Sequence, residues 1–332
     1  MKWVNYFILK QKNKIEREEV KMKIVSLFSG AGGLDLGLVL AGNKVIWAND
    51  IDKDAVATYR ENIGDYIVCE DIRKIAIKDI PDADVVVGGF PCQGFSVANR
   101  FRVLDDERNQ LYKFFYNVIK EKQPKYFIAE NVKGILSLAK GEAIKQIVQD
   151  FETAGYITTV NLVNMANYGV PQTRQRVIII GQRKDIGEKM KFQFPQPTHD
   201  KNGKDGLKKW VSIREAINHF PDPDTANNVV NHIYSSYKVE FRNYTGHRQT
   251  DPEKPSPTIL ARGNGGGGVC AIPHYNCKRR LTIRESASVQ TFPEDFHFIG
   301  AMNSCYRQIG NAVPVMFAKR LGEELIRLEK EV

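Results

Sequence analysis

The segment that follows Met22 carries a repeated pattern that restricts the possible folds more than any other part of the chain. Lys23–Phe28 is a short run of mainly apolar residues, and the glycine-rich segment Ser29–Gly33 follows it directly. A helical stretch leads to a second strand-like run, Lys44–Ala48, and a third follows at Tyr66–Glu70. Strands that alternate with helices predict a mainly parallel sheet with helical crossovers, and so an α/β fold.

Groups suited to a nucleoside lie where these three strands are expected to end. The first strand leads into a Gly-x-Gly turn at Gly30, which permits close approach of the backbone to a ligand. Asp50 follows twenty residues later, where a Rossmann-like unit places the carboxylate that binds ribose hydroxyls. Asp71 follows the third strand and could bind an adenine amino group. Helix capping remains an alternative role for each aspartate.

A cysteine and a glutamate follow the fourth and fifth predicted strands. Asp84–Val87 leads into Gly88–Ser96, which contains Cys92, and Lys125–Ala129 leads into Glu130. Because catalytic groups lie beyond the carboxyl ends of strands in open α/β sheets, the two side chains are expected to converge. A thiolate can add to C6 of a pyrimidine while a carboxylic acid hydrogen-bonds ring N3, and C5 can then take a methyl group from a sulfonium cofactor. Taken singly, a buried structural cysteine and a solvated acid are the alternatives.

The rest of the chain predicts two further strands, a different middle segment and two C-terminal helices. The strands are expected at residues 156–163 and 177–181, which makes seven in all. The helices are expected at Thr282–Gln290, which opens with a capping box, and at Val315–Leu328. Prolines, asparagines and glycines accumulate after Gly181. We therefore expect an extension at 1–21, a catalytic and cofactor-binding domain at 22–181, a target-recognition domain at 182–279 and a segment returning to the catalytic domain at 280–332.

The positive charge of the chain is concentrated in that middle segment. The net charge is +9. Residues 181–280 hold 17 Lys and Arg against 10 Asp and Glu, or +7, and residues 1–21 hold 6 against 3, or +3, so the remainder sums to −1. This distribution predicts a polyanion-binding region beside a near-neutral core, with a solvated basic surface as the alternative.

Other general features exclude several classes of protein. The apolar runs are too short to span a membrane. Five cysteines at irregular spacing argue against a disulfide framework and indicate a reducing compartment. The N-terminal apolar stretch is short and lacks a small-residue cleavage site, so a secretory signal is not expected, and Met22 is an alternative start.

Taken in order, the motifs resemble those of the DNA (cytosine-5)-methyltransferases, and more narrowly the bacterial type II restriction-modification methylases. This resemblance implies a class I S-adenosylmethionine-dependent methyltransferase fold, a Rossmann-like seven-stranded mixed sheet with a second, smaller target-recognition domain. It also implies methyl transfer to C5 of a flipped-out cytosine in a short specific duplex sequence, through a covalent adduct between Cys92 and C6. The matching stretches are Phe28–Gly33, Gly89–Ser96, Glu130–Val132, Gln172–Arg176, Arg280–Pro293 and Gln308–Pro314.

The resemblance assigns roles residue by residue. The catalytic set is Cys92, Glu130, Asn131, Arg174, which would support the site, and Arg176, which would hold the cytosine O2 side. The S-adenosyl-L-methionine pocket would be formed by Phe28, Gly30, Gly32, Gly33, Asp50, Ile51, Asp71, Ile72, Pro91, Leu111, Asn311 and Val313. The DNA contacts would come from Gln93, Ser96, Arg108 on a mobile loop, Arg248, Thr258, Arg262 and Gly266. Thr258-Ile259 departs slightly from the usual Thr-Leu of the family.

The implied partners follow from this activity. We expect double-stranded DNA as the substrate, a cognate restriction endonuclease as a functional partner, no membrane and no metal. We also expect a monomer in the bacterial cytoplasm, associated with the nucleoid through DNA.

Four alternatives remain at this point. An RNA (tRNA) cytosine-5 methyltransferase shares the motif order, but the Pro-Pro-Cys and Cys-Phe-Thr typical of that branch are absent. A nicotinamide dehydrogenase would not explain Cys92 together with Glu130. A non-catalytic DNA-binding regulator on the same scaffold would lack a reactive group, and none is missing. A zinc site of Cys270, His274 and Cys277 has no evident fourth ligand.

Overall fold

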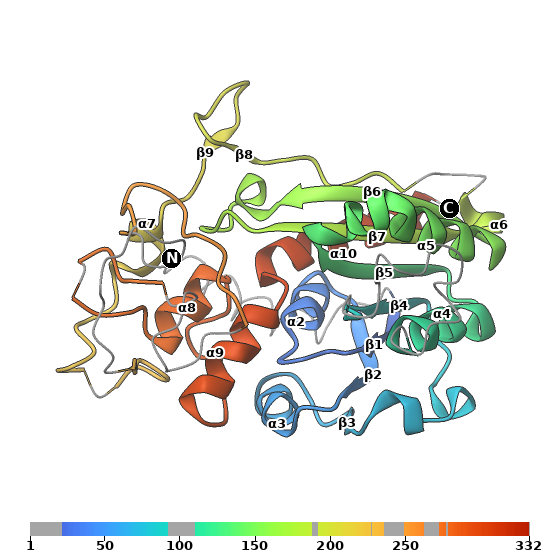
Figure 1. The fold of residues 1–332 in the computed structure, drawn as a ribbon, viewed down its shortest axis with the longest axis horizontal. Coiled ribbons are helices and arrows are strands. Elements are labelled where there is room, and N and C mark those ends of the chain that lie inside the picture. Colours follow the sequence, from blue (N-terminus) through green and yellow to red (C-terminus); the bar gives the residue numbers. More distant parts are fainter. Residues whose placement is uncertain are drawn as a thin grey trace.

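A seven-stranded sheet forms the centre of the molecule (Figure 1). The computed structural model describes residues 22–91, 110–187, 192–226, 228–235, 249–261, 272–276 and 278–331. The strand order is β3-β2-β1-β4-β5-β7-β6. Neighbouring strands are parallel except for β7, which runs antiparallel to both β5 and β6. The predicted seven-stranded mixed sheet is therefore confirmed. The strands are β1 (Lys23–Leu27), β2 (Lys44–Asp50), β3 (Ile67–Cys69), β4 (Val85–Gly88), β5 (Tyr126–Val132), β6 (Tyr156–Asn164) and β7 (Gln175–Arg183).

Helices cover both faces of this sheet. Successive side chains of a strand point to opposite faces, so each face carries apolar side chains that a layer of helices buries. Ile24 of β1 packs into a core with α2 (Gly33–Leu40), α3 (Lys53–Asn62) and α10 (Val315–Glu331). Its neighbour Val25 packs into a second core on the opposite face, with α4 (Gln110–Lys122) and α5 (Glu142–Thr153). Strands of sheets that are covered on both faces are buried along their length, as β4 is throughout and β1 is from Ile24 to Leu27.

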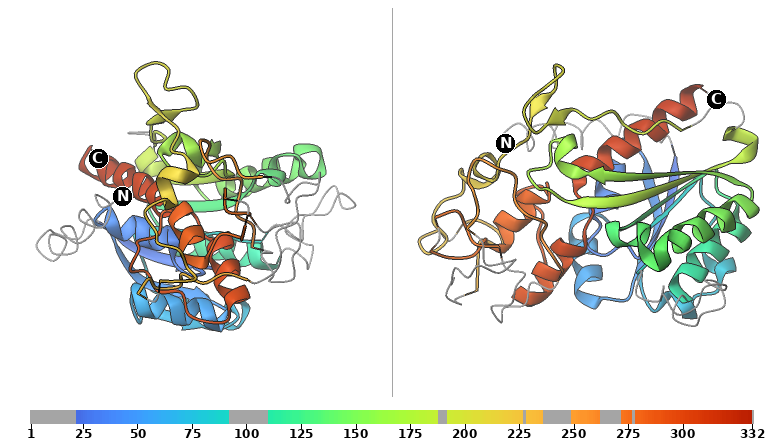
Figure 2. Two further views of the ribbon diagram at one scale, coloured as in Figure 1. Left: turned by 90° about the vertical axis from the view of Figure 1, so that its left-hand side faces the viewer. Right: turned by 45° about the horizontal axis from the view of Figure 1, so that its top comes forward.

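A smaller lobe lies beyond the carboxyl ends of the parallel strands (Figures 1 and 2). It contains α7 (Ile213–Ile217), α8 (Ile283–Val289) and α9 (Met302–Asn311), which share a third hydrophobic core. The capping box predicted at the start of α8 is confirmed, because Thr282 and Glu285 cap each other's backbone amides. The loop that carries β8 (His199–Asp200) and β9 (Lys208–Lys209) projects from the body in every view.

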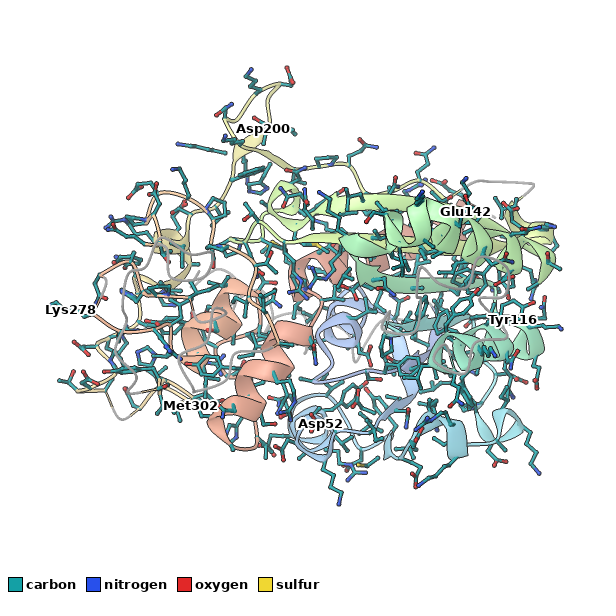
Figure 3. All side chains as sticks on the ribbon, viewed as in Figure 1. Asp52, Tyr116, Glu142, Asp200, Lys278 and Met302 are labelled. Atoms are coloured by element: carbon teal, nitrogen blue, oxygen red, sulfur yellow. The ribbon has the colours of Figure 1, made fainter. Side chains whose placement is uncertain are left out.

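The two lobes meet along α3 and the chain around α9. Asp52, which caps α3, pairs with Arg307 of α9 at 2.8 Å, and Figure 3 shows Asp52 beside α3 at this junction. The side chain of Asn62 donates to the carbonyl of His297 at 2.8 Å and accepts from its amide at 2.7 Å. These contacts fix the small lobe against the end of the sheet that carries the glycine-rich turn.

The differences from the sequence-based expectations that matter most for the site concern three elements. Strand β5 continues through Glu130 to Val132 instead of ending at Ala129, because β7 runs beside it and supplies antiparallel partners as far as Val132. Strand β7 begins at Gln175 and not at Val177, because Arg176 pairs with both β5 and β6 and Gln175 pairs with Asn164 of β6. Helix α9 was not predicted: its buried face includes the small or polar Ser304, Gln308 and Gly310, so it lacks a continuous apolar stripe.

Candidate active site

The glycine-rich turn after β1 is held against the end of β2 by two hydrogen bonds. The amide of Ser29 donates to the carbonyl of Asn49 at 2.9 Å, and the amide of Gly30 donates to Oδ2 of Asp50 at 2.7 Å. Gly30 and Gly32 adopt φ angles of +55° and +83°, a region in which a side chain is strained. The turn therefore requires glycine at these two positions.

The carboxylate of Asp50 is fixed in position beside this turn. Its second oxygen, Oδ1, accepts a hydrogen bond from the amide of Asp52 at 2.9 Å, and burial raises its pKa. Each carboxylate oxygen can accept a further bond, so Asp50 retains capacity for a ligand. Ile51 is 66% exposed beside it, and Phe28 adopts a φ of +57°, which is uncommon for a residue other than glycine. Together these residues present an acceptor and an apolar surface to the same space.

Asp71 combines a capping role with a place in the site. Its side chain accepts from the backbone amide of Arg73 at 3.1 Å and from Nε of the same arginine at 2.9 Å. These hydrogen bonds lower the pKa of Asp71 to about 2. The capping alternative is thus correct for Asp71, and the arginine that pairs with it also borders the cavity.

A fully buried carboxylate lies beneath the turn. Asp35 in the first turn of α2 accepts hydrogen bonds from Ser26 Oγ and from the Tyr59 hydroxyl, both at 2.8 Å. Ser29 Oγ in turn donates to Ser26 Oγ at 2.9 Å. Burial raises the pKa of Asp35 to about 6, although both hydrogen bonds act to lower it. A chain of hydroxyl groups therefore connects the buried acid with the glycine turn.

Glu130 and Asn131 occupy the part of β5 that lies beside the end of β4. The amide Nδ2 of Asn131 donates to the carbonyl of Phe90 at 2.9 Å, which holds the backbone that precedes Pro91. A Cβ atom added to Gly89 would lie 3.3 Å from Oε2 of Glu130, so the chain passes very close to the acid. The acid is therefore adjacent to the segment that leads into the predicted nucleophile.

Two arginines from β7 and the turn before it lie on the same side of the site. Nε of Arg176 is 2.8 Å from Oε1 of Glu130. Arg174 is 1% exposed and donates to the carbonyls of Ile259 and Gly310, at 3.1 Å and 3.0 Å. Burial lowers the pKa of Arg174 to about 9, and the positive charge of Arg176 acts in the same direction to a smaller extent. The side chain therefore stays cationic at neutral pH.

These groups surround one cavity of about 830 Å³, large enough for a nucleoside-sized ligand and a base. It runs from the glycine turn, past the ends of β2 and β3, to Glu130 and Arg176. The predicted residues that line it are Phe28, Gly30, Gly33, Asp50, Ile51, Asp71, Ile72, Pro91, Leu111, Glu130, Asn131, Arg174, Arg176, Asn311 and Val313. Gly32 does not line it and instead packs against Tyr59 and Ile63.

Thr258 lies at the junction of the lobes. Its hydroxyl donates to the carbonyl of Thr173 at 3.0 Å, and the adjacent Ser256 accepts from the amide of Thr173 at 2.9 Å. The other predicted DNA contacts and the nucleophile lie outside the described residues: Cys92, Gln93, Ser96, Arg108, Arg248, Arg262 and Gly266.

Sequence reasoning missed several residues that shape the site. Asp35 and Arg73 lie next to predicted positions, but nothing in the chain marks them as partners of the turn and of Asp71. Gln172 and Gln290 are both fully buried and hydrogen-bonded to each other at 2.8 Å. They fall inside quoted motifs, yet a contact across 118 residues has no local signal.

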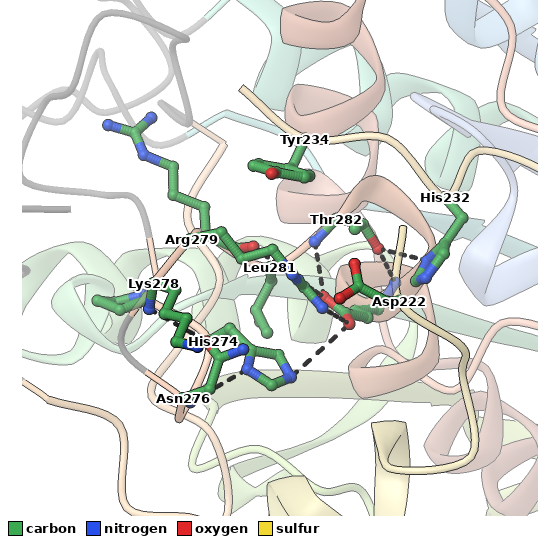
Figure 4. Close-up of polar contacts among 12 residues, drawn as sticks. Asp222, His232, Tyr234, His274, Asn276, Lys278, Arg279, Leu281 and Thr282 are labelled. Carbon is green, nitrogen blue, oxygen red and sulfur yellow. Dashed lines mark hydrogen bonds and ion pairs between the residues drawn. The ribbon is translucent and has the colours of Figure 1, made fainter. Parts of the chain in front are cut away.

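A second network of buried charges lies in the small lobe (Figure 4). Arg279 donates two hydrogen bonds to the carboxylate of Glu285, at 2.7 Å and 2.8 Å, and Glu285 also accepts from the amide of Thr282. Nε2 of His274 is 3.8 Å from the same carboxylate, and burial lowers the pKa of this histidine. His232 contacts the Thr282 hydroxyl at 3.0 Å. Every charge in this network has a partner, so it stabilises the start of α8.

The described residues hold no group of three or more His, Cys, Asp or Glu suited to a metal ion. Of the zinc ligands considered above, Cys270 and Cys277 lie outside the described residues. Within the part of the chain that the structure describes, no helix is both long and apolar enough to cross a membrane.

Comparison with known proteins gives consistent matches over nearly the whole chain. Residues 22–327 match the family model for C-5 cytosine-specific DNA methylase. The type II methyltransferase M.NgoFVII of Neisseria gonorrhoeae is 41% identical over 340 residues, which cover 96% of this chain and 90% of the relative. M.FnuDI of Fusobacterium nucleatum, also a type II methyltransferase, is 38% identical over 335 residues, with 93% and 96% covered.

Solved structures give the same result for the fold. A prophage-encoded E. coli protein described as a DNA modification methyltransferase superposes with a TM-score of 0.71 at 26% identity, covering 92% of this chain and 99% of that one. The S. pombe Dnmt2 methyltransferase superposes with a TM-score of 0.68 at 21% identity, covering 93% and 99%, a likeness of fold alone.

Proposed function

The chain belongs to the C-5 cytosine-specific DNA methylases and is a DNA (cytosine-5)-methyltransferase, and from this premise we propose how its own residues divide the reaction. The cavity has two ends. The end between the glycine turn, Asp50 and Asp71 takes S-adenosylmethionine, and the end beside Glu130 and Arg176 takes a cytosine rotated out of duplex DNA. The observation that carries this proposal is that both sets of residues line one continuous cavity.

The residues at the first end fit the cofactor. Asp50 has free acceptor capacity for ribose hydroxyls, and Ile51 offers an exposed apolar surface for the adenine ring. The amino group of adenine is a donor, which suits the carboxylate of Asp71. Asn311 and Val313 line the cavity from the end of α9 and close this pocket from the small-lobe side. When bound, S-adenosylmethionine supplies an electrophilic methyl group on its sulfonium.

The residues at the second end fit a cytosine. N3 and O2 are adjacent atoms of the ring, and Glu130 and Arg176 are adjacent side chains. We propose that Glu130 donates a proton or hydrogen bond to N3 and that Arg176 holds O2. Both contacts draw electron density out of the ring while the thiolate of Cys92 adds to C6. With the cofactor bound, C5 would receive its methyl group and leave S-adenosylhomocysteine. Loss of the C5 proton to water and release of the Cys92 thiolate would then restore the ring. Asn131 supports this step by holding the Phe90 carbonyl ahead of the nucleophile segment.

We propose that the domains divide the work in the same way. Residues 22–181 form the catalytic and cofactor-binding domain, 182–279 the target-recognition domain, and 280–332 the returning segment. In that segment α8 and α9 pack with α7 of the small lobe, and α10 packs on the sheet. Thr258 lies at the junction and is proposed to border the flipped base. Gln93, Ser96, Arg108, Arg248, Arg262 and Gly266 are the further proposed DNA contacts. A monomer acting on nucleoid DNA in the cytoplasm, beside a cognate restriction endonuclease, is the cellular setting proposed for this activity.

Bisulfite sequencing of DNA from cells that express the protein tests the proposal directly. We expect one short sequence to carry 5-methylcytosine at high occupancy. A purified-protein assay of tritium transfer from S-adenosylmethionine, comparing a duplex of that sequence with tRNA, then tests the substrate class. Transfer to tRNA in place of DNA would overturn the proposal.

A further inference from the structure

Two buried glutamines connect the recognition segment with the segment that closes the cofactor end. Oε1 of Gln172 accepts from the backbone amide of Ile259 at 2.9 Å, and Nε2 of Gln172 donates to Oε1 of Gln290 at 2.8 Å. Nε2 of Gln290 donates to the carbonyls of Ile309 and Ala312, at 2.7 Å and 3.1 Å. Both glutamine side chains are completely shielded from solvent.

The direction of this chain of hydrogen bonds is determined by its ends. Carbonyl oxygens only accept, so Nε2 of Gln290 must face Ile309 and Ala312, and its oxygen must face Gln172. The amide of Ile259 only donates, so it must meet the oxygen of Gln172. The two side chains therefore fit in a single orientation.

Two further contacts join the same segments. The guanidinium of Arg174 bridges the carbonyls of Ile259 and Gly310. A Cβ atom added to Gly310 would lie 2.4 Å from the amide nitrogen of Ala261 and 2.5 Å from the carbonyl carbon of Leu260. The two backbones are thus in direct contact, which only glycine allows at this position.

Both segments form walls of the proposed catalytic cavity. Leu260 and Ala261 line it from one segment, and the run from Gly310 to Val313 lines it from the other. A shift of either wall would break these hydrogen bonds and leave buried amide and carbonyl groups unpaired, which is unfavourable. The two walls therefore move as one body.

We propose that Gln172 and Gln290 are positioning residues that couple cofactor binding to DNA binding. Ordering of the Gly310–Val313 wall by the cofactor is transmitted through the two amides to the Thr258–Ile259 segment, and the reverse holds when DNA orders that segment. This inference rests on the proposed function, because it takes the two ends of the cavity as the cofactor and cytosine ends. It goes beyond that function by naming the residues that link the two binding events.

The test measures binding and not turnover. The affinity of the protein for S-adenosylhomocysteine is measured by calorimetry with and without a duplex carrying the sequence found by bisulfite sequencing. The ratio of the two dissociation constants is the coupling factor, and the same factor must appear in the duplex affinity with and without S-adenosylhomocysteine. We expect a coupling factor of at least about fivefold for the unaltered protein, the lower end of the usual range.

Three variants test the role of the glutamines. Gln172→Met and Gln290→Met keep the length of the side chain and remove its hydrogen bonds, and we expect each to reduce the coupling factor to below about twofold. Gln182→Met is the matched control. Gln182, on β7, is likewise buried, but its side chain accepts from the amide of Phe192, away from the cavity. It should leave the coupling factor unchanged. If either methionine variant fails to fold, the double variant Gln172→Met/Gln290→Met replaces it, since changing both partners leaves neither glutamine amide unpaired.

The outcomes separate this inference from the function on which it rests. A coupling factor of one in the unaltered protein, or an unchanged factor in the glutamine variants, overturns the inference while both ligands still bind. Absence of binding to S-adenosylhomocysteine or to the duplex overturns the proposed function instead. A general loss of stability would weaken both affinities to a similar extent and leave their ratio unchanged. It would therefore not produce the expected fall in the coupling factor.

Discussion

Arg176 and Glu130 form a close ion pair, with Nε and Oε1 2.8 Å apart and only 12% and 13% of the two side chains exposed. The pair exists because β7 runs antiparallel to β5. In that register Arg176 lies opposite Val132, two residues beyond Glu130, which brings the two side chains to the same face on a diagonal. If β7 ran parallel to β5, the order of its residues along β5 would be reversed, and Arg176 would not lie beside Glu130. The reversed strand therefore assembles the proposed contacts to N3 and O2 of cytosine.

Replacement of Glu130 by glutamine should lower the rate of methyl transfer strongly. An amide keeps the shape of the side chain but cannot transfer a proton to N3, and such a loss typically costs about 10²–10⁴-fold. Tritium transfer to the duplex measures the effect. Glu142→Gln is the control, because Glu142 is an exposed acid on α5 that pairs with Lys145 of the same helix. A Glu130→Gln variant with the activity of this control would remove the acid from the mechanism.

Replacement of Cys92 by alanine should abolish methyl transfer and leave duplex binding intact. The thiolate is the only group proposed to form a covalent bond with C6, so no other residue can substitute for it. A denaturing gel tests the adduct itself. Incubation with S-adenosylmethionine and a duplex that carries 5-fluorocytosine at the target position should trap the unaltered protein, since after methyl transfer fluorine cannot leave C5 as a proton does. Trapping of the Cys92→Ala variant would show that another nucleophile acts.

Replacement of Arg174 by lysine should reduce both stability and activity, although the charge is kept. The guanidinium donates to Ile259 and Gly310 from two different nitrogens, and a lysine side chain presents one compact ammonium instead of this planar fork. Loss of one buried bond to a charged donor should lower the free energy of unfolding by about 1.5–3 kcal/mol. Urea denaturation measures this value. Lys133→Arg serves as the comparison, because Lys133 contacts Gln175 at the exposed surface. Equal stability of Arg174→Lys and the unaltered protein would contradict the bridging role.

The sequence was sufficient for the strands that end in reactive groups, and insufficient for what holds those groups in place. The strands before Asp50 and Glu130 are apolar runs with clear local signals, and the reactive residue follows each run. Even there the end of β5 was misplaced, because its length depends on β7, which lies more than forty residues later in the chain. Strand pairing of this kind is a property of the whole sheet, which no single segment encodes.

Contacts between residues that are far apart in the sequence were harder still to predict from the sequence. Gln290 bonds Gln172 across 118 residues, and Arg174 reaches Gly310 across 136. Glutamine and arginine are ordinary surface residues, so their types do not suggest burial. Helix α9 was missed for a related reason: small and polar residues interrupt the apolar residues of its buried face, so the sequence shows no continuous apolar stripe.

Replacement of Gly33 by alanine should weaken cofactor binding. The added Cβ atom would lie 2.5 Å from the carbonyl oxygen of Val313 and 3.0 Å from Cβ of Ala312. The segment that closes the cofactor end would have to move away from the glycine turn, at a typical cost of about 1–3 kcal/mol. Calorimetry with S-adenosylhomocysteine should show an affinity reduced by about tenfold or more, since about 1.4 kcal/mol corresponds to a factor of ten. Gly134→Ala is the control, because its nearest neighbour would be 4.0 Å away. Equal affinities in the two variants would place the closing segment elsewhere.

Asp35 should make the stability of the protein depend on pH between about 4 and 6. Its pKa is raised from 3.8 to about 6 by burial, so the folded state binds a proton more tightly than the unfolded chain does. The contribution of this group to stability is thus fully present below pH 4 and is lost as the pH rises through 6. A shift of about two pH units corresponds to about 3 kcal/mol. The groups facing the acid are the hydroxyls of Ser26 and Tyr59, with the carboxylate of Asp50 also raising the pKa.

The Asp35→Asn variant isolates this effect. Asparagine cannot ionise, and the hydroxyls of Ser26 and Tyr59 can each donate or accept, so both can still bond the amide. Urea denaturation of both proteins from pH 4 to pH 7.5 gives the difference in the free energy of unfolding. We expect the unaltered protein to lose about 3 kcal/mol relative to the variant across this range, and the difference to stay constant above pH 7. Titration of the remaining groups is common to both proteins and cancels. A difference that does not change with pH would mean that Asp35 is already ionised at pH 4, and that the hydroxyl chain beneath the turn stabilises a charge instead of a proton.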